Sequence, residues 1–378
     1  MTLRCVLVGY GRMGALHHAK LTGLGVRVVG VVDSRLSGSA RASAGLPVIS
    51  PAGAARLRPD LWDICVPTAA HAAVLAEVCG GDARAHVIVE KPLCAPGDVP
   101  VVRGLLAAHR GRVVVGEHYL SSAVLERVAE ATDRLGLVPR RVTVEMSKHR
   151  GRDVSQGRFQ DRDLGALGYE GPHLVAVVDS LGRRLGLDPV PEGTVAVEFH
   201  GAADGAGPTQ DGVEVRYRTR APGSHCEVSL YSSMTGRIGH PGLRPDGPAL
   251  ASSGIGPGSD TRYRAVRVEG VDPQGRPWQV TGAFEPVPGL PRNHGTVTVR
   301  PPGQPAAAER HVVRDAVRDD SLGRHLARTL AHFQGLGPNP APPGEALDQL
   351  ALLHAWSGRP APAPSPTTRQ PLCLGVPT

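Results

Sequence analysis

The sequence predicts an α/β domain with a doubly wound parallel sheet, followed by an α+β domain with a largely antiparallel open sheet. Its 378 residues exceed the usual size of one compact domain, which favours two. From residue 3 to about residue 116, short valine-rich runs alternate with helical patterns, as is typical of parallel strands covered on both faces. Beyond this point the runs alternate in period two, which indicates a sheet with one packed face and one wet face.

The composition excludes several classes of function. At 41% hydrophobic and 20% charged residues, the chain is an ordinary soluble globular protein. Aromatic residues make up only 3%, so the core must consist of Val, Leu, Ala and Ile. The formal charge of +7 accompanies an Ala-, Gly-, Pro- and Arg-rich composition that is typical of a GC-rich genome. A nucleic-acid-binding face needs clustered charge and stacking aromatics, and both are scarce, so we expect no nucleic-acid partner.

The chain shows no targeting or membrane signal. No apolar run is long enough to span a bilayer, and no cleavage-site pattern follows the first strand. We therefore expect a cytoplasmic protein with no membrane partner. The six cysteines show no paired metal spacing, and Cys5 and Cys65 lie inside predicted buried strands. They are interpreted as reduced thiols, with no metal site.

The first domain is predicted to span residues 1–118. Its strands are expected in five apolar runs, separated by helical segments: LRCVLV (3–8), VRVVGVV (26–32), LWDICV (61–66), AHVIVE (85–90) and GRVVVG (111–116). Continuous apolar strands of this kind are buried on both faces of a parallel sheet.

The second domain is predicted to span residues 119–358. Its alternating strands are expected near residues 138–147, 193–200, 212–219, 224–231, 261–270 and 295–300. One strong helical stretch interrupts them, near 164–182, and helical patterns at 320–334 and 344–356 close the domain, with Asp320 or Ser321 as a helix cap. The Gly/Pro-rich stretches 201–212 and 238–261 are predicted to be long loops. The Pro-rich tail, 359–378, lacks periodicity and is expected to be disordered.

Three glycines directly after the first predicted strand form a dinucleotide-binding motif. Gly9, Gly11 and Gly14 have G-x-G-x-x-G spacing at the start of a helix. The first permits a tight turn, the second lets the backbone approach a pyrophosphate, and the third allows close packing of helix on strand. This context predicts a Rossmann domain whose loop contacts the cofactor through Gly9, Tyr10, Gly11, Arg12, Met13 and Gly14.

The second strand ends in an acidic residue, Asp33, about twenty positions after the glycines, where a ribose 2′-hydroxyl is bound. Its carboxylate would repel a 2′-phosphate, which favours NAD. Arg35 lies two residues later and could instead bind that phosphate, so NADP stays open. Ser34, between them, is also expected at the cofactor.

Lys91 is one of only three lysines in an arginine-rich chain, and it follows the strand at 85–90. Ligands gather beyond the carboxyl ends of strands in such sheets, so we expect Lys91 on the nicotinamide side. Pro92 restricts Lys91 to an extended backbone. An ammonium near an oxidised nicotinamide has a lowered pKa, which suits proton exchange near neutral pH. The alternative is a solvated strand end. Cys94 has no features of a nucleophile.

With these motifs the chain resembles the family of glucose–fructose oxidoreductase and inositol dehydrogenase, Gfo/Idh/MocA. The resemblance covers residues 1–185 well, through the glycine motif, DICVPTAAH, VEKPL and GEHYLSS, and the later sheet only in pattern. It implies that NAD, or NADP, lies along Pro67, Thr68, His71, Glu90 and Lys91. It also implies that Tyr119 and His118 line the substrate pocket.

The family carries an Asp and a His four residues apart at the start of a helix in the second domain. Here His173 matches the histidine, but Tyr169 stands where the Asp is expected. Residues four apart share a helix face, so both can face the cleft, whereas Glu170 should point elsewhere. Without the carboxylate, His173 lacks a partner that raises its basicity, and Tyr169 binds a hydroxyl or shares the proton relay instead. A histidine at a domain junction with a structural role is the alternative.

The resemblance implies an NAD(P)-dependent oxidoreductase that acts on a secondary alcohol or ketone carbon of a sugar, nucleotide sugar or (amino)cyclitol. His173 would take the hydroxyl proton while Lys91 hydrogen-bonds the same oxygen, or the two roles would be exchanged. Composition and analogy suggest specialised-metabolite biosynthesis of the aminoglycoside type. A glycosidase using NAD transiently, and a non-catalytic dinucleotide sensor, are alternatives from the same family. Family members pair through the exposed sheet face, which implies a homodimer or homotetramer.

A basic run lies between the first strand of the second sheet and this helix. Residues 146–163 contain Lys148, His149, Arg150, Arg152, Arg158 and Arg162. Such a run is a solvated loop, or it binds an anionic group such as the phosphate or diphosphate of a sugar. Lys148 and Arg150 are the expected substrate-binding members.

Overall fold

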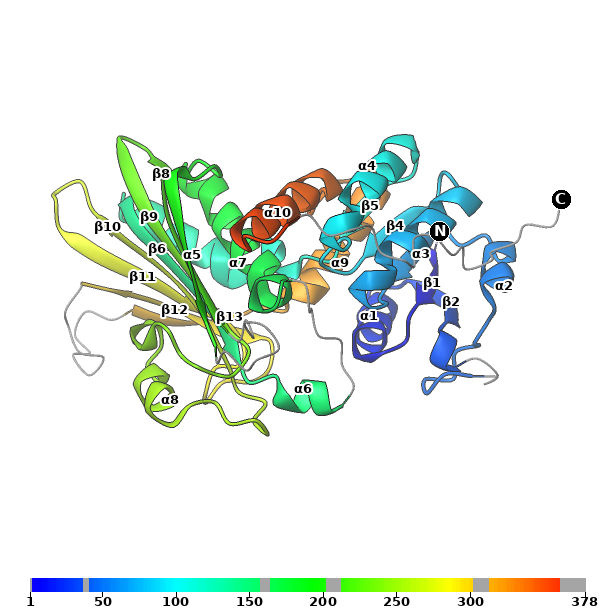
Figure 1. The fold of residues 1–378 in the computed structure, drawn as a ribbon, viewed down its shortest axis with the longest axis horizontal. Coiled ribbons are helices and arrows are strands. Elements are labelled where there is room, and N and C mark those ends of the chain that lie inside the picture. The colour runs from blue at the N-terminus through cyan, green and yellow to red at the C-terminus, as the bar shows by residue number, and fades with distance from the viewer. Residues whose placement is uncertain (1, 37–40, 157–163, 202–211, 302–312, 361–378) are drawn as a thin grey trace. The chain divides into compact units, whose positions relative to one another are not determined.

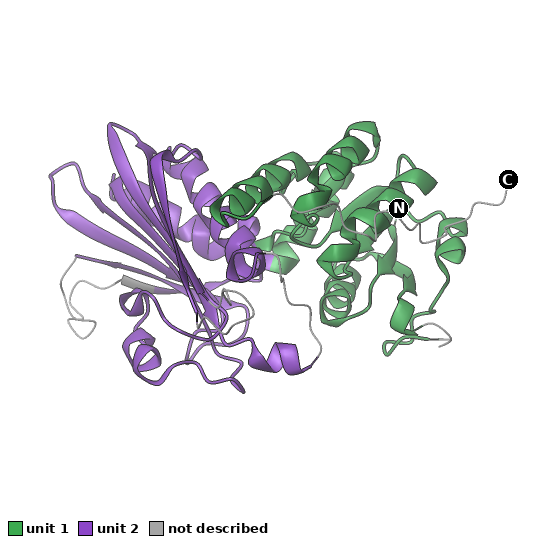
Figure 2. Cartoon of the chain, viewed as in Figure 1, with its two compact units in different colours: residues 1–118, 322–378 green, residues 119–321 purple. Residues whose placement is uncertain are grey.

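In the computed structural model of the protein, the described residues are 2–36, 41–156, 164–201, 212–301 and 313–360. Arg158, Arg162, Cys373 and the tail beyond residue 360 lie outside them. The chain divides into two compact units (Figure 2): the first contains Met1–His118 and Leu322–Thr378, and the second contains Tyr119–Ser321.

The first unit contains a five-stranded parallel sheet with the order β2-β1-β3-β4-β5 (Figure 1). Its strands are β1 (Arg4–Val8), β2 (Arg27–Val32), β3 (Leu61–Ile64), β4 (His86–Val89) and β5 (Val113–Val115). Each lies inside a predicted run, so the prediction of a doubly wound parallel sheet is confirmed. Most of their side chains are buried, as expected for strands covered on both faces.

The C-terminal helices belong to the first unit, although the sequence led us to expect them in the second domain. The helices of this unit are α1 (Arg12–Gly23), α2 (Pro51–Arg56), α3 (His71–Gly81), α4 (Val99–Ala108), α9 (Ser321–Phe333) and α10 (Pro343–Trp356). The physical reason lies at the edge strand β5. The carbonyl of Val115 lies 2.8 Å from Nε2 of His325, and its amide donates to Ala341 at 3.1 Å. The C-terminal segment thus satisfies backbone groups that an edge strand would otherwise expose.

The second unit is built on an eight-stranded sheet with the order β13-β12-β11-β10-β6-β9-β8-β7. Only β6 and β9 pair in parallel, so the prediction of a largely antiparallel sheet is confirmed. The strands are β6 (Val138–Lys148), β7 (Glu192–His200), β8 (Gly212–Ala221), β9 (Ser224–Ser233), β10 (Arg262–Val271), β11 (Pro277–Ala283), β12 (His294–Arg300) and β13 (Val313–Arg318). The sequence analysis missed β11 and β13, whose residues show weak alternation and gain their strand conformation from paired neighbours.

Two long helices, α5 (Ala123–Arg134) and α7 (Ala166–Leu185), pack on one face of this sheet (Figure 1). The sequence analysis identified α7 but missed α5, which is amphipathic and buries Val124, Val128 and Ala131. It therefore wrongly counted a single long helix between the boundary at 118 and the closing helices. Short helices α6 (Gly151–Ser155) and α8 (Gly247–Ser253) complete the unit, and α8 lies within the stretch 238–261 expected to be a loop.

Among the described residues, no helix combines the length and apolar character needed to cross a membrane. The five described cysteines are free thiols. Cys5 lies inside β1 as expected, whereas Cys65 follows the last residue of β3.

Buried Asp319 joins the end of β13 to the start of α5. Its carboxylate accepts hydrogen bonds from the Ser122 hydroxyl at 2.8 Å and from the Ala123 amide at 2.7 Å. Replacing Asp319 with Ala should lower the free energy of unfolding by about 1–3 kcal/mol, because buried donors lose their acceptor. Thermal unfolding measures this loss. The exposed Asp348→Ala, which removes a surface ion pair with Arg103, is the control and should change the midpoint little.

Candidate functional site

The three glycines of the predicted motif bring β1, β3 and α1 together. Gly9 has a φ of +91°, and a Cβ there would lie 2.7 Å from the carbonyl oxygen of Cys65. A Cβ on Gly14 would lie 2.1 Å from the carbonyl oxygen of Gly9. At Gly11 a Cβ would meet only the Arg35 side chain, at 3.3 Å. Gly9 and Gly14 therefore allow close backbone packing, while Gly11 leaves space for a ligand to approach the backbone.

Helix α1 presents its N-terminus at this loop. Arg12 and Met13 form its first turn, and no side chain caps it. The amide groups of an uncapped helix N-terminus attract anions, so the loop fits the pyrophosphate of a dinucleotide. The Tyr10 hydroxyl lies 2.9 Å from Nδ1 of His18, which holds the Tyr10 side chain against α1.

Asp33 follows β2 and reaches the glycine loop. Its carboxylate accepts hydrogen bonds from the Tyr10 amide at 2.7 Å and the Arg35 amide at 2.8 Å, and the Arg35 guanidinium lies 3.3 Å away. Burial alone would raise the pKa of Asp33, but these donors lower it below the usual value. The ionised carboxylate is placed to accept from a ribose hydroxyl and to repel a 2′-phosphate. Ser34 and Arg35 are exposed in a short 3₁₀ turn, and the charge of Arg35 is partly neutralised by its ion pair with Asp33.

A buried ion-pair cluster that the sequence analysis missed lies beside the glycine loop. Nδ1 of His17 lies 2.9 Å from Asp63, and its Nε2 lies 3.0 Å from Glu90. The three side chains come from α1, β3 and the end of β4, and all three are buried. A signal was present: both carboxylates fall in or directly after apolar strands, where an ionised group requires a buried partner. His17 also shares the buried face of α1 with Gly14 and Leu21.

The cluster holds one cation between two anions. Burial would lower the pKa of His17, but the Asp63 carboxylate outweighs burial and the pKa lies well above its usual value. Burial would raise the pKa of Glu90, but the hydrogen bond and charge of His17 lower it to about 2. Both groups are therefore charged near neutral pH.

The Glu90 carboxylate ties the end of β4 to α1 through His17. The cofactor contact that the resemblance implies for Glu90 stays a prediction. The ion pair with His17 fixes the backbone that immediately precedes Lys91. The lysine itself is half-buried, and the peptide bond between Lys91 and Pro92 is cis.

His71 also supports this region, and the expectation that it lies along the cofactor stays a prediction. Its ring nitrogens lie 2.8 Å from the carbonyl oxygens of Val66 and Pro92, and the side chain is buried. The imidazole thus connects the segment before Pro67 with the segment after Lys91. Thr68, the next expected contact, is largely buried in the 3₁₀ turn that follows Pro67.

Cys94 does not provide a nucleophile in the first unit, in agreement with the sequence analysis. Burial, followed by the charge of Asp98, raises the pKa of Cys94 to about 12. Its thiol is therefore protonated at physiological pH. His118 ends the first unit in the 3₁₀ turn His118–Ser121.

In the second unit, Tyr119 contacts His173, and both side chains are buried. The ring edge of Tyr119 packs on the imidazole with centroids 4.9 Å apart. The Tyr119 hydroxyl accepts a hydrogen bond from Arg264 at 2.9 Å. Arg264 also donates to both carboxylate oxygens of Glu170, at 3.1 and 3.2 Å. Glu170, which the sequence analysis expected to point elsewhere than the cleft, is thus linked through Arg264 to Tyr119. Arg264 was missed because it comes from β10, distant in sequence.

The expected substrate-binding cations have partners inside the unit. Nζ of Lys148 donates to Asp153 at 2.9 Å, and Arg150 donates to Asp153 at 2.9 Å and also to Glu170. The Arg150 guanidinium lies over the Tyr169 ring, 4.4 Å from its centroid. Lys148 and Arg150 are thus neutralised by carboxylates of the same unit, which weakens the case that they bind a substrate anion directly.

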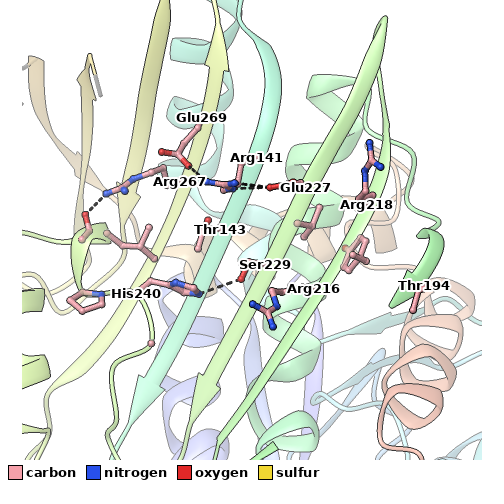
Figure 3. Close-up of a pocket in the computed structure, with 16 residues that line it drawn as sticks. Arg141, Thr143, Thr194, Arg216, Arg218, Glu227, Ser229, His240, Arg267 and Glu269 are labelled. Atoms are coloured by element: carbon pink, nitrogen blue, oxygen red, sulfur yellow. Dashed lines mark hydrogen bonds and ion pairs between the residues drawn. The ribbon is translucent and has the colours of Figure 1, made fainter. Parts of the chain in front are cut away.

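Two cavities are described on the open face of the second sheet, and no expected site residue lines either of them. The larger, of about 780 Å³, is shown in Figure 3. Its arginines are largely paired; Arg141, for example, lies 2.7 Å from Glu227. Its lining residues alternate with the apolar positions of the same strands, so it lies on the sheet face opposite α5 and α7.

A comparison with known families finds a match to part of the first unit. Residues 3–116 match the family described as "Oxidoreductase family, NAD-binding Rossmann fold", Gfo/Idh/MocA. Residues 3–116 are thus similar to the NAD-binding domain of this oxidoreductase family. The resemblance seen in the sequence is thereby confirmed, and NAD is the cofactor of this domain type. No curated protein matches the chain.

Solved structures share the fold over most of the chain. UDP-N-acetylglucosamine 3-dehydrogenase GnnA from Acidithiobacillus ferrooxidans is 16% identical with a TM-score of 0.63, and the match covers 94% of this chain and 99% of that chain. A proposed myo-inositol dehydrogenase from Sinorhizobium meliloti 1021 is 18% identical with a TM-score of 0.63, covering 94% and 96%. GenD2 from gentamicin A biosynthesis, in complex with NAD, is 18% identical with a TM-score of 0.63, covering 94% and 93%. At these identities the similarity shows the shared fold only.

The His17 cluster predicts a specific pH dependence. His17→Asn should lower the free energy of unfolding by about 3–5 kcal/mol near pH 6, because it leaves buried carboxylates without a cation. The loss should be largest between about pH 4.5 and 6.5, the ordinary pKa values of Glu90 and His17. As pH rises from 6.5 through the raised pKa of His17, or falls from 4.5 toward 2, the difference from wild type should shrink.

Thermal unfolding across this pH range measures the effect. His18→Asn is the matched control, since His18 follows His17 in α1 but contacts the Tyr10 hydroxyl instead of a carboxylate. A loss that is the same at every pH would show that the cluster acts by packing and not by charge.

Proposed function

We propose that the chain is an NAD(P)-dependent oxidoreductase that transfers a hydride between the nicotinamide and a secondary alcohol or ketone carbon of a sugar, nucleotide sugar or (amino)cyclitol. The observation that carries the proposal is the position of Lys91. It lies two residues beyond the end of β4 of an NAD-binding Rossmann sheet, and ligands of such sheets lie beyond the carboxyl ends of the strands. The preceding residue is anchored by a buried ion pair, so the lysine backbone is held in place.

The first unit fits the dinucleotide. The space over Gly11 and the uncapped start of α1 suit its pyrophosphate, and the ionised Asp33 suits a ribose hydroxyl. When bound, the nicotinamide supplies the carbon that accepts or donates the hydride. The partial pairing of Arg35 with Asp33 favours NAD over NADP.

Side chains of the protein accept and return the hydroxyl proton. An alkoxide is too basic to form unaided, so a base must take the hydroxyl proton as the hydride leaves. We assign this role to His173, with Lys91 as the donor that stabilises negative charge on the same oxygen, or the reverse. Tyr119 orients the imidazole through its ring edge, and its own hydroxyl is held by Arg264. His118, Tyr119 and Tyr169 are proposed to contact the substrate.

The names of two structurally similar proteins support the proposed substrate class. One relative acts on UDP-N-acetylglucosamine, and another belongs to gentamicin A biosynthesis. A sugar or aminocyclitol hydroxyl in specialised-metabolite biosynthesis is therefore the substrate that we propose.

The first test of this function is Lys91→Met. The substitution should reduce turnover by at least a thousandfold, because it removes a donor and proton-exchanging group at the reacting oxygen, while NAD binding should change by less than about threefold. Turnover is measured as NAD(P)H absorbance with a panel of sugars, nucleotide sugars and cyclitols, and NAD binding by calorimetric titration.

Lys20→Met is the control, since Lys20 lies in the last turn of α1. Unchanged turnover in Lys91→Met would overturn the site assignment. Hydrolysis without net NADH formation would instead identify a glycosidase, and NAD binding without turnover on any compound would favour a sensor.

The second test is Asp33→Ala. It should weaken NAD by roughly tenfold or more through loss of a charged acceptor for the ribose, and it should affect NADP less because a repulsive charge is removed. The two dissociation constants are compared by calorimetric titration. An equal loss for both cofactors would remove the case that Asp33 recognises the ribose.

A further inference from the structure

A cluster of charged residues where β6 and β10 pair in the second unit contains more cations than anions. We call it the strand-end cluster, and its described members are Lys148, Arg150, Arg262, Arg264, Asp153 and Glu170. Four cations thus face two carboxylates. Lys148 and Arg150 share Asp153, while Arg150 and Arg264 share Glu170.

Strand register places the surplus charge at Arg262. In the antiparallel pairing of β10 with β6, Arg262 lies directly opposite Lys148. Directly opposite side chains share a sheet face with Cβ atoms about 5 Å apart, where like charges are destabilising. Arg264 lies two residues further along β10 and therefore on the same face.

Within the described parts of the chain, the Arg262 guanidinium has no hydrogen bond or ion pair, although the residue is half-buried. The nearby charge of Arg264, together with burial, lowers the pKa of Arg262 to about 10. In addition, the Nε atoms of Arg150 and Arg264 are buried without an acceptor among the described residues. The guanidinium groups of Arg262, Arg150 and Arg264 thus all have N–H donors without an acceptor among the described residues. An anion with several oxygen atoms would supply these acceptors.

We propose that Arg262 binds an anionic group, a carboxylate or a phosphate, on the substrate, and that the strand-end cluster selects anionic over neutral sugars or cyclitols. This inference rests on the proposed oxidoreductase function, because it assigns the anion to the same substrate. It also reassigns the anion-binding role: Lys148 and Arg150 support the cluster through Asp153 and Glu170, and Arg262 makes the recognition contact.

Arg141 on the open sheet face lies in a different environment. It lies between two carboxylates, 2.7 Å from Glu227 and 3.7 Å from Glu269, and its side chain is 54% exposed. Its charge is therefore compensated and hydrated, in contrast to Arg262.

The experiment compares wild type with Arg262→Gln and with the control Arg140→Gln, an exposed arginine on β6. Each full-length protein is saturated with NAD and titrated calorimetrically with inorganic phosphate, D-glucuronate and D-glucose. Wild type and Arg140→Gln should bind phosphate or glucuronate saturably and at least tenfold more tightly than glucose. Arg262→Gln should lose that preference by tenfold or more, since one charge-assisted contact is removed. Binding of phosphate alone indicates a phosphorylated substrate, and binding of glucuronate alone a carboxylated one.

Thermal unfolding of the same variants without ligand separates binding from folding. Arg262→Gln should leave the midpoint unchanged or raise it, because it removes an uncompensated charge. Saturable binding of neither anion to wild type, equal loss in Arg140→Gln, or a clear fall in the midpoint of Arg262→Gln would overturn the inference. Retained anion selectivity with no hydride transfer on any substrate would count against the proposed function alone.

Discussion

The imidazole of His17 lies between the carboxylates of Asp63 and Glu90, where the His17 and Asp63 side chains are fully buried and the Glu90 side chain is nearly so. Removing such charges from water is costly, and the cost is offset only when all three meet. The ion pairs of His17 with Asp63 and Glu90 hold α1 against β3 and against the end of β4. Since α1 begins at the glycine loop and Lys91 lies two residues beyond the end of β4, one buried contact relates the phosphate-binding backbone to the proposed catalytic ammonium.

The second unit uses buried charge differently. Around His17 two carboxylates flank one imidazolium, so the buried cation is compensated, as expected for a structural cluster. In the strand-end cluster, Glu170 and Asp153 neutralise part of the charge, and the half-buried guanidinium of Arg262 remains. A buried charge without a counter-charge lowers the stability of the fold. Local features that lower stability are typical of functional sites. The contrast separates the residues that hold the protein together from those available to a ligand.

Tyr169 stands where the resemblance in the sequence implies an aspartate, and its surroundings fit this arrangement. The aromatic ring lies against the Arg150 guanidinium, and the neighbouring Glu170 carries the negative charge on the adjacent helix position. Through Arg264, this carboxylate orients Tyr119, whose ring contacts His173. The Glu170 carboxylate thus supports the His173 imidazole through two intermediate side chains, those of Arg264 and Tyr119. Because structural relatives at 16–18% identity share only the fold, substrate selection has to be argued from contacts of this kind.

The sequence by itself determined the parallel sheet, the glycine loop, Asp33 and the position of Lys91 after β4, because each depends on periodicity or spacing within a short segment. It also indicated most strands of the second sheet, but not β11, β13 or α5. Only the tertiary structure decided that α9 and α10 complete the first unit at β5, that His17 pairs with Asp63 and Glu90, that Arg264 pairs with Glu170, and that Arg262 lies opposite Lys148. The reason is physical: edge-strand hydrogen bonds and buried charges are satisfied by segments far apart in the chain, and no local pattern specifies which segments meet.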